Sequence, residues 1–315
     1  MRAPAHRADG RSLWHEPVRR DEDDVHKPCG VNVAPRLLRD PRGTERMMDT
    51  MPATESTRES RAVARWNPAR RWYHPWLAAI VAGVSRFIMR RMNTLTMEGR
   101  ERFEALADRN GRGLLTFSNH ASLFDDPLLT ANFTTSSYED LRWVASDALN
   151  FFGSGWKAWI FTAGKCVPIV RGAGVDQGGF SFLRDRLAEG AWVHIFPEGG
   201  RTRDPRALMR TPFKLGIGRL IDEARPIALP FYHHGMQGVL PVGSSRPRTG
   251  QHVHLLFGEA TACDEAFLTS VDADLGARNE RARWEALAQW AYGELRALEL
   301  RVHPVAREEC AVGVH

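Results

Sequence analysis

The residues with the clearest chemical potential are His120 and Asp125, which lie five positions apart in the segment 118–127 (SNHASLFDDP). A carboxylate that accepts a hydrogen bond from one ring nitrogen of a histidine fixes the tautomer and leaves the other nitrogen free to take a proton. A free histidine titrates near pH ~6.5, so such a pair can serve as a general base at neutral pH. Taken alone, however, a pair of this kind more often only ties down a turn.

The elements on either side of the pair predict where it lies. An apolar run at 114–117 is typical of a short buried strand, and Asp126-Pro127 favours the start of a helix, with Asp126 as its cap and Pro127 at its first position. The pair would therefore lie on the turn between a strand and a helix, where α/β proteins place functional residues.

Strand-like and helix-like patterns alternate from residue 95 to about residue 300. This alternation predicts an α/β domain in which a mostly parallel central sheet is flanked by helices. The expected strands cover 114–117, 143–145, 166–170, 192–196, 227–231 and 253–257. The expected helices lie around 127–133, 151–161, 180–187, 213–223 and 279–300.

Polar residues follow two more of these strands at the point where each strand ends. Arg171 follows one, and Glu198, Gly199 and Arg201 follow the other. If the strands are parallel, these residues and His120 emerge on the same carboxyl edge of the sheet, where open α/β folds bind ligands. Arginine suits bidentate phosphate contact, and glycine lets backbone amides approach an anion, so the pattern indicates transfer chemistry on a phosphate-bearing substrate. The alternatives are that Arg171 is a surface charge and that Glu198 forms a structural ion pair.

Other candidate ligand residues do not form a recognisable metal site. His194 falls within an expected strand and is more consistent with a sheet-face residue than with a catalyst. His233 and His234 are adjacent, so in a strand they would point to opposite faces. The cysteines form no CxxC pair, which argues against structural zinc or a disulfide framework. They are Cys29, Cys166, Cys263 and Cys310. The sequence thus predicts neither a metal nor a cofactor.

The net charge of +5 and the pI near 9.3 favour an anionic partner such as a phospholipid surface. No block of lysine and arginine is interleaved with aromatic residues, so we expect no nucleic-acid partner. The sequence also contains no run of about 18 apolar residues that would predict a membrane-spanning helix.

The segment 66–92 combines aromatic and aliphatic side chains at helical spacing with arginines at both ends. An amphipathic helix lying in the membrane interface has this composition. A helix packed on the core of the protein would fit equally well, and the two interpretations are compatible if each uses one face.

Residues 1–60 are rich in arginine, proline and acidic residues and poor in periodic apolar positions, which predicts disorder. The cluster Met47-Met48-Asp49-Thr50-Met51 raises the alternative hypothesis that translation starts there and that the preceding residues are a gene-calling artefact. The first 25 residues lack the apolar core of a signal peptide. We therefore expect a bacterial protein that associates peripherally with the cytoplasmic face of a membrane.

In type and order, these motifs resemble those of the glycerolipid acyltransferase family, in particular the bacterial lysophosphatidate acyltransferases. The matching elements are Asn119-His120 followed by Asp125, then Arg171, then 196–199 (FPEG), with Pro230 at the place of the last block. The resemblance covers about residues 70–300. It implies a glycerol-phosphate acyltransferase fold in an acyltransferase domain at 95–300, with a tail at 301–315.

Within the family, the segments 164–168 (GKCVP), 192–199 (WVHIFPEG) and 216–221 (GIGRLI) look most like those of the tafazzins, which are phospholipid–lysophospholipid transacylases. Arg201 departs from this pattern, because it is placed as in the lysophosphatidate acyltransferases, whereas tafazzins lack it. The acyl donor is therefore open between the ester of another phospholipid and an acyl thioester on coenzyme A or acyl carrier protein.

The resemblance implies that His120, oriented by Asp125, deprotonates the free hydroxyl of a lysophospholipid for acyl transfer. It assigns phosphate contact to Arg171, and it places Asn119, Glu198, Gly199 and Arg201 in the substrate site. The runner-up activity is a thioester-dependent 1-acylglycerol-3-phosphate acyltransferase. Two other classes stay open, namely a metal-dependent hydrolase that uses His120, Asp125 and Glu198 as ligands, and a non-catalytic membrane-binding protein.

Overall fold

The computed structural model describes residues 55–134, 137–244, 246–275 and 279–303. The chain divides into two units, Met1–Met51 and Pro52–His315, and every described residue lies in the second. The predictions for residues 1–54, including the alternative start at Met47, and for the tail beyond 303 fall outside the described residues.

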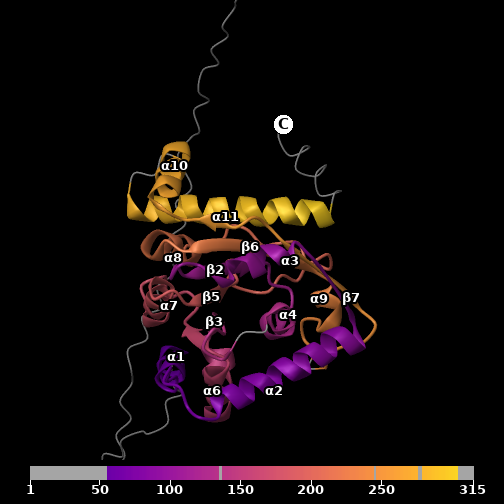
Figure 1. Cartoon of the computed structure of the whole chain (residues 1–315). Coiled ribbons are helices and arrows are strands. Elements are labelled where there is room, and N and C mark those ends of the chain that lie inside the picture. Colours follow the sequence, from indigo (N-terminus) through magenta and orange to yellow (C-terminus); the bar gives the residue numbers. More distant parts are fainter. Residues whose placement is uncertain (1–54, 135–136, 245, 276–278, 304–315) are drawn as a thin grey trace, which may run out of the picture. The chain divides into compact units, whose positions relative to one another are not determined.

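The centre of the domain is an eight-stranded sheet in the order β1-β7-β6-β2-β5-β3-β4, with β8 paired to β6 (Figure 1). Strands β2 to β6 run parallel to one another, whereas β7 and β8 pair antiparallel with β6, and β1 is parallel to β7. The predicted mostly parallel sheet is confirmed. The strands are β1 (Thr94–Glu98), β2 (Leu114–Ser118), β3 (Trp143–Asp147), β4 (Cys166–Ile169), β5 (Trp192–Ile195), β6 (Ile227–His234), β7 (His252–Phe257) and β8 (Thr261–Ala262).

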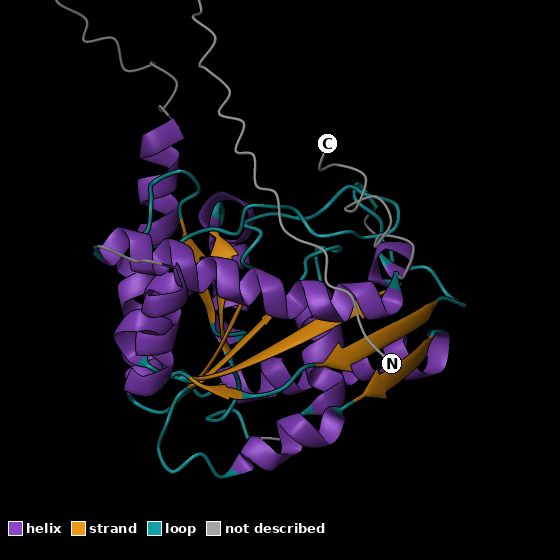
Figure 2. Cartoon of the chain, turned by 90° about the horizontal axis from the view of Figure 1, so that it is seen from above, coloured by secondary structure: helices purple, strands orange, loops and turns teal. Residues whose placement is uncertain are grey.

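The two faces of the sheet bury different side chains, because neighbouring residues of a strand point to opposite faces. In β2, Leu115 and Phe117 pack into one apolar cluster and Leu114 packs into another. The helices that contribute to the first cluster include α7 (Gly178–Ala188), α8 (Gly216–Ala224) and α11 (Glu280–Val302). Figure 2 shows α11 crossing in front of the strands. Helices on both sides explain why β2 and β5 are buried along their whole length.

The opposite face is covered by α4 (Asp125–Phe133), and α2 (His74–Phe87) packs against α4. Arg86 and Arg90 hold the two helices together: Arg86 Nε donates to the Ala131 carbonyl at 2.8 Å, and Arg90 Nε donates to Asn132 Oδ1 at 2.8 Å. In Figure 1, α2 and α11 therefore lie on opposite sides of the sheet.

The other helices and helical turns are shorter than α2 and α11. They are α1 (Glu55–Ala64), the π-helical turn Ile88–Met92, α3 (Arg100–Glu104), the 3-10 turn Ala105–Ala107, α5 (Ala148–Phe152), α6 (Gly155–Ala163), α9 (Met236–Val239) and α10 (Glu265–Leu275). Helix α1 overlaps the end of the segment 1–60, which was predicted to be disordered. It is folded because Ala62 is completely buried in an apolar cluster that includes Val144 and Phe152.

The helix predicted over 66–92 begins only at His74, and its last turn is π-helical. Trp66 instead packs edge-to-face on Phe182 of α7, with ring centroids 4.9 Å apart. Pro68 follows Asn67, and a residue before proline is disfavoured in the helical conformation. The helical spacing of Trp66 with the later apolar residues was therefore misleading.

Candidate active site

His120 and Asp125 form the predicted pair. His120 Nδ1 lies 3.0 Å from Asp125 Oδ2, the Asp125 side chain is fully buried, and that of His120 is 15% exposed. The same carboxylate oxygen accepts the backbone N–H groups of Ala121 at 2.7 Å and Ser122 at 2.8 Å. Asp125 thus holds both the ring and the turn that carries it. Within the described parts of the chain, His120 Nε2 has no hydrogen-bond partner, so this nitrogen is free to accept a proton.

The surroundings of Asp125 keep its carboxylate ionised. Burial alone would raise the pKa of this carboxyl, but the nearby His233, the hydrogen bond from His120 and the Ser122 amide outweigh burial and lower it. An ionised carboxylate stabilises the imidazolium that His120 becomes when it takes a proton.

The ring plane of His120 is fixed by Phe196, the residue after β5. The two rings stack with their centroids 4.1 Å apart and their planes 20° from parallel. The sequence analysis counted Phe196 only as part of a motif. Its contact follows from the parallel pairing of β2 with β5, which aligns Phe117 with Ile195 and brings the residues after both strands together.

Glu198 binds protein backbone through both carboxylate oxygens. Oε1 accepts the His120 N–H at 2.7 Å, and Oε2 accepts the Arg210 N–H at 2.8 Å. The side chain is almost fully buried, and burial raises its pKa to about 8 despite these two hydrogen bonds. The carboxyl group therefore holds the turn of His120 against the segment after β5. This fits the alternative that Glu198 has a structural role, although its partners are backbone amides rather than an arginine side chain.

Gly199 allows that segment to fold back over the site. Its φ of +66° is in the left-handed region, and a Cβ atom there would lie 2.9 Å from Lys214 Cγ. The Lys214 N–H donates to the Pro197 carbonyl at 2.8 Å, and the Thr202 N–H donates to the His120 carbonyl at 2.7 Å. The backbone of residues 199–202 is thus held directly beside His120.

Arg201 is brought to His120 by this arrangement, since its neighbour Thr202 bonds to the His120 carbonyl. The Arg201 side chain is partly buried, and it makes no hydrogen bond or ion pair with any residue of the described ranges. A guanidinium group that is not neutralised by the protein is available for an anionic ligand.

Arg171 lies elsewhere on the same edge of the sheet. It follows β4, the edge strand, and its Nε lies 2.8 Å from Asp147 Oδ2 while 59% of its side chain is exposed. Three strand spacings separate β4 from β2, which amounts to roughly 14 Å. The structure therefore brings His120, Asp125, Glu198, Gly199 and Arg201 together and keeps Arg171 apart from them.

Asn119 is completely buried and faces protein rather than solvent. Its Oδ1 accepts the His233 N–H at 2.9 Å, and its Nδ2 donates to the His233 carbonyl at 2.8 Å. The side chain therefore joins the end of β2 to the end of β6, which is a supporting role rather than the substrate contact implied by the family resemblance.

His233 is a site residue that the sequence analysis missed. Its Nε2 lies 2.9 Å from the Asn119 carbonyl and 3.5 Å from Asp125 Oδ2, and its side chain is fully buried. Burial lowers the pKa of His233, so the ring is neutral. His234 is only partly buried, in agreement with the expectation that the two histidines point to opposite faces. His194 is buried in the sheet, as predicted, with Nδ1 2.9 Å from Thr116 Oγ1.

The predicted cap role of Asp126 is wrong. Helix α4 begins two residues earlier than predicted, its N-cap is Phe124, and no side chain caps it. Asp126 instead forms a buried ion pair with Arg142, in which Arg142 Nε donates to Asp126 Oδ1 at 2.8 Å. A carboxylate in this position is better stabilised by a buried guanidinium than by the helix amides, and only the fold brings Arg142 there.

Protein partners already use most of the potential ligand atoms of His120, Asp125 and Glu198, and within the described residues only His120 Nε2 and Asp125 Oδ1 of this set have no hydrogen-bond partner. Among the described residues, no group of three or more histidine, cysteine or acidic side chains is arranged to hold a metal ion. His120 Nδ1 and Asp125 Oδ2 bond to each other, and both oxygens of Glu198 accept backbone N–H groups. This geometry suits a general base rather than the three-ligand set of the hydrolase alternative.

An exposed apolar surface, here called the α2–α6 face, lies away from His120. It consists of the large apolar side chains Trp72, Trp76, Ile80, Val81, Val84 and Phe87 on and before α2, together with Trp156 and Trp159 on α6. Helices α2 and α6 pack against each other. None of the helices in the described residues is both long and apolar enough to cross a bilayer.

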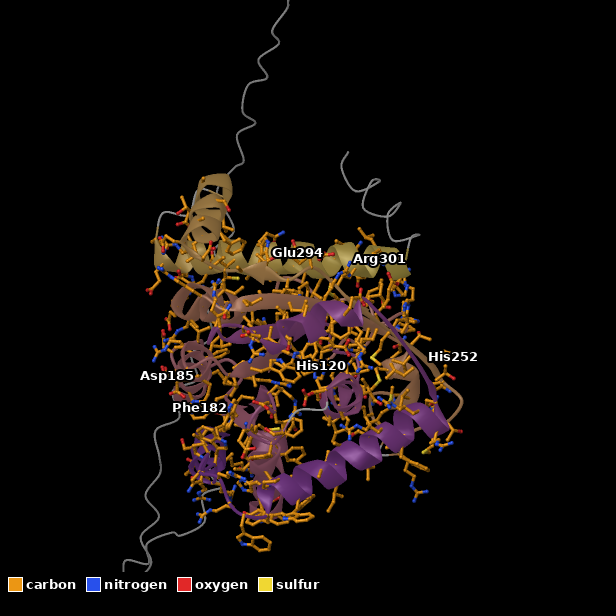
Figure 3. The ribbon with its side chains drawn as sticks, in the orientation of Figure 1. His120, Phe182, Asp185, His252, Glu294 and Arg301 are labelled. Atoms are coloured by element: carbon orange, nitrogen blue, oxygen red, sulfur yellow. The ribbon has the colours of Figure 1, made fainter. Side chains whose placement is uncertain are left out.

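In Figure 3, His120 is labelled in the middle of the view, between the ribbons of α2 and α11.

Comparisons with known proteins indicate the family of the chain. A family model described as "Acyltransferase" matches residues 94–234. A "Taffazin" from Dictyostelium discoideum is 34% identical over 194 residues, covering 58% of this chain and 67% of that protein. A "Tafazzin" from Drosophila melanogaster is 31% identical over 248 residues, covering 75% of this chain and 65% of that protein. The chain thus spans about two thirds of the length of these two relatives.

Two further matches belong to proteins with other names. An "N-acylphosphatidylethanolamine synthase" from Arabidopsis thaliana is 33% identical over 165 residues, which is 49% of this chain and 57% of that protein. The solved structure of the 1-acyl-sn-glycerophosphate (LPA) acyltransferase PlsC from Thermotoga maritima superposes with a TM-score of 0.51 at 18% identity, covering 72% of this chain and 80% of that chain. At this identity the likeness concerns the fold.

Proposed function

Because the chain belongs to the acyltransferase family and is an acyltransferase, we propose that it moves a fatty acyl group onto the free hydroxyl of a lysophospholipid. The observation that carries this proposal is the 3.0 Å contact between His120 Nδ1 and Asp125 Oδ2 beside a free Nε2. This is the geometry that a base needs to activate a hydroxyl group.

The proposed reaction needs no covalent enzyme intermediate. His120 Nε2 removes the proton from the acceptor hydroxyl, and the oxygen attacks the acyl carbonyl of the donor. The tetrahedral intermediate collapses, the bond to the donor's oxygen or sulfur breaks, and the imidazolium returns its proton to that leaving group. Asp125 stays ionised throughout and balances the charge on the ring.

Arg201 is better placed than Arg171 to bind the phosphate of the acceptor. It lies beside His120, and its guanidinium has no carboxylate partner among the described residues. Arg171 would have to leave Asp147 and reach across two strands. We therefore assign the acceptor phosphate to Arg201 and a secondary contact, at most, to Arg171.

For the acyl donor we propose another phospholipid, which gives tafazzin-like transacylation in phospholipid remodelling. The motif resemblance and the two tafazzin matches support this choice. An acyl thioester of coenzyme A or acyl carrier protein is the alternative donor, and Arg201 in the segment after Glu198 supports it.

We further propose that the protein works at a membrane surface, with the α2–α6 face in contact with the bilayer. Trp76 and Ile80 are 71% and 62% exposed, and an apolar surface of this kind is costly in water. Its aromatic residues suit the interface between head groups and acyl chains. Location at the cytoplasmic face of a bacterial membrane stays a prediction.

The decisive experiment supplies purified protein with a labelled lysophospholipid and, in separate reactions, acyl-CoA or an intact phospholipid. Label in a diacyl product with phospholipid alone supports transacylation, and label only with acyl-CoA supports the thioester alternative. No transfer from either donor, in a protein that is folded by circular dichroism, would contradict the proposed function.

A further inference from the structure

A hollow of about 250 Å³ lies at the rim of the α2–α6 face and contains no residue of the His120 site. Its wall includes Arg65, Asn67, Arg71, Tyr73, His74 and Trp159. Among the described residues, no aspartate or glutamate lines it. Two arginines without an acidic neighbour make a site that attracts anions.

The two arginines are presented in different ways. Arg65 is anchored, because its Nη1 donates to the Gly153 carbonyl at 2.9 Å and to the Phe152 carbonyl at 3.2 Å, which leaves its other nitrogens unused within the described ranges. The Arg71 side chain is exposed and has no partner there. Its neighbour Arg70, by contrast, is paired with Glu139 at 2.7 Å. Arg71 is therefore the free cation of the hollow.

The neutral residues of the hollow are also fixed in place. The Arg71 N–H donates to His74 Nδ1 at 3.3 Å, and burial together with the nearby Arg71 charge lowers the pKa of His74. His74 is consequently neutral, and the positive charge comes from the arginines. Tyr73 and Trp159 stack with ring centroids 5.1 Å apart.

The position of the hollow relates it to lipid. Trp159 belongs both to its wall and to the α2–α6 face, and Trp72, which is 83% exposed, directly precedes Tyr73. Tryptophan and tyrosine prefer the level of the head groups, because their rings are apolar and their N–H or O–H groups need polar partners. When the apolar face enters a bilayer, its rim lies at the depth of the lipid phosphates.

We propose that this hollow binds the phosphate of an anionic phospholipid head group, as a docking site separate from the catalytic centre. The proposal rests on the membrane contact proposed above. Arg65 and Arg71 would clasp the phosphate oxygens, since a guanidinium offers paired N–H groups that match them. A lipid bound in this hollow would hold α2 and α6 against the membrane surface. Docking of the protein would then depend on anionic lipid.

The test measures binding to vesicles rather than catalysis. Wild-type protein, Arg71→Gln and the matched control Arg91→Gln are each sedimented with pure phosphatidylcholine vesicles and with phosphatidylcholine vesicles that contain phosphatidylglycerol as the minor component. Both substitutions remove one exposed arginine, but Arg91 follows α2 at its other end and does not line the hollow. Within the described ranges, neither the Arg71 nor the Arg91 side chain has a hydrogen-bond or ion-pair partner whose loss would disturb folding.

We expect Arg71→Gln to weaken binding to the anionic vesicles about tenfold, the loss of one charge-assisted phosphate contact, and Arg91→Gln to weaken it less than about twofold. Binding to pure phosphatidylcholine should be the same in all three proteins. Equal losses in the two variants would overturn the head-group site in favour of diffuse attraction.

Two further outcomes separate this site from the proposed function. If wild-type protein binds neutral and anionic vesicles equally, the head-group site is wrong while membrane contact stands; if it binds neither, the membrane contact itself fails. Calorimetry with inorganic phosphate tests whether the hollow binds free phosphate rather than the phosphate of a lipid. Binding of inorganic phosphate that Arg71→Gln abolishes, without any preference for anionic vesicles, would overturn the lipid assignment.

Discussion

The side-chain amide of Asn119 pairs in both directions with the backbone of His233, through contacts of 2.9 and 2.8 Å. This pairing joins the ends of β2 and β6, two neighbouring strands, and the turn of His120 follows β2. His233 returns the contact by placing Nε2 at 2.9 Å from the Asn119 carbonyl. His120 therefore follows a residue that three contacts join to His233. The position of the His120 ring thus depends on a residue more than a hundred positions away in the chain.

Asn119→Ala should destabilise the protein. The substitution leaves the N–H and carbonyl groups of His233 buried without partners, and we expect a cost of about 2–4 kcal/mol in the free energy of unfolding. Denaturant titration followed by circular dichroism measures it. Transfer activity should fall as well, because the turn of His120 loses its anchor. A variant as stable as the wild type would show that the clamp contributes little.

His120→Ala should abolish acyl transfer while leaving the fold intact. General base catalysis contributes about 10²–10⁴-fold to rate, and the His120 side chain is partly exposed, so its removal leaves no large internal cavity. The initial rate with labelled lysophospholipid gives the activity, and the thermal midpoint serves as the control. Activity within about tenfold of the wild type would contradict the role of His120 as the base.

Asp125→Asn should reduce both activity and stability. Three N–H groups converge on Asp125 Oδ2, and asparagine can keep an acceptor oxygen in that place. It lacks the charge that balances the imidazolium, and its amide nitrogen would be buried without an acceptor at the place of Oδ1, which has no partner. We expect a loss of at least about 10²-fold in kcat and about 1–3 kcal/mol in stability. His120→Ala provides the comparison, since it should lose the activity without the same cost in stability.

Arg201→Ala should raise KM for the lysophospholipid about tenfold or more, because it removes a charge-assisted contact to the acceptor phosphate. Arg171→Ala, made in parallel, removes a guanidinium that already pairs with Asp147 and lies far from His120. Its effect on KM should be smaller. Steady-state kinetics on both variants decide the assignment, and a larger effect at Arg171 would reverse it.

His194 should make the fold sensitive to acid. Burial lowers its pKa from 6.5 to about 4, so between these values the unfolded chain binds a proton that the folded protein does not. Stability is therefore lost as pH falls from about 6.5 to about 4, by an amount on the order of 3 kcal/mol at most.

The measurement for His194 is the thermal midpoint as a function of pH in wild type and in His194→Gln. The variant should be less stable at neutral pH, because Thr116 Oγ1 loses its imidazole partner, yet it should lose less stability on acidification. Glu198 titrates in an overlapping range, with a pKa raised to about 8, but it is present in both proteins and cancels in the difference. Parallel pH profiles would contradict a buried neutral His194.

Local sequence was sufficient to predict the fold class and the contact between His120 and Asp125, whose catalytic role stays a proposal. The residues that follow β2, namely His120, Asp125 and Pro127, are sufficient to form this turn, because a carboxylate five residues after the histidine can reach its ring directly. The alternation of strand-like and helix-like patterns likewise indicated a mostly parallel sheet flanked by helices. Such patterns report which side chains avoid water, and each segment carries that preference in its own residues.

Only the tertiary structure decided which polar residues meet. Periodicity carries no information on strand order, so the distance between Arg171 and His120 became known only once β4 was found at the edge of the sheet. For the same reason Glu198 was not recognised as a brace, because its partners are backbone amides, which every sequence contains. Hydrogen bonds between groups far apart in the chain exist only after the strands are arranged, and here they determine how firmly the encoded pair of His120 and Asp125 is held.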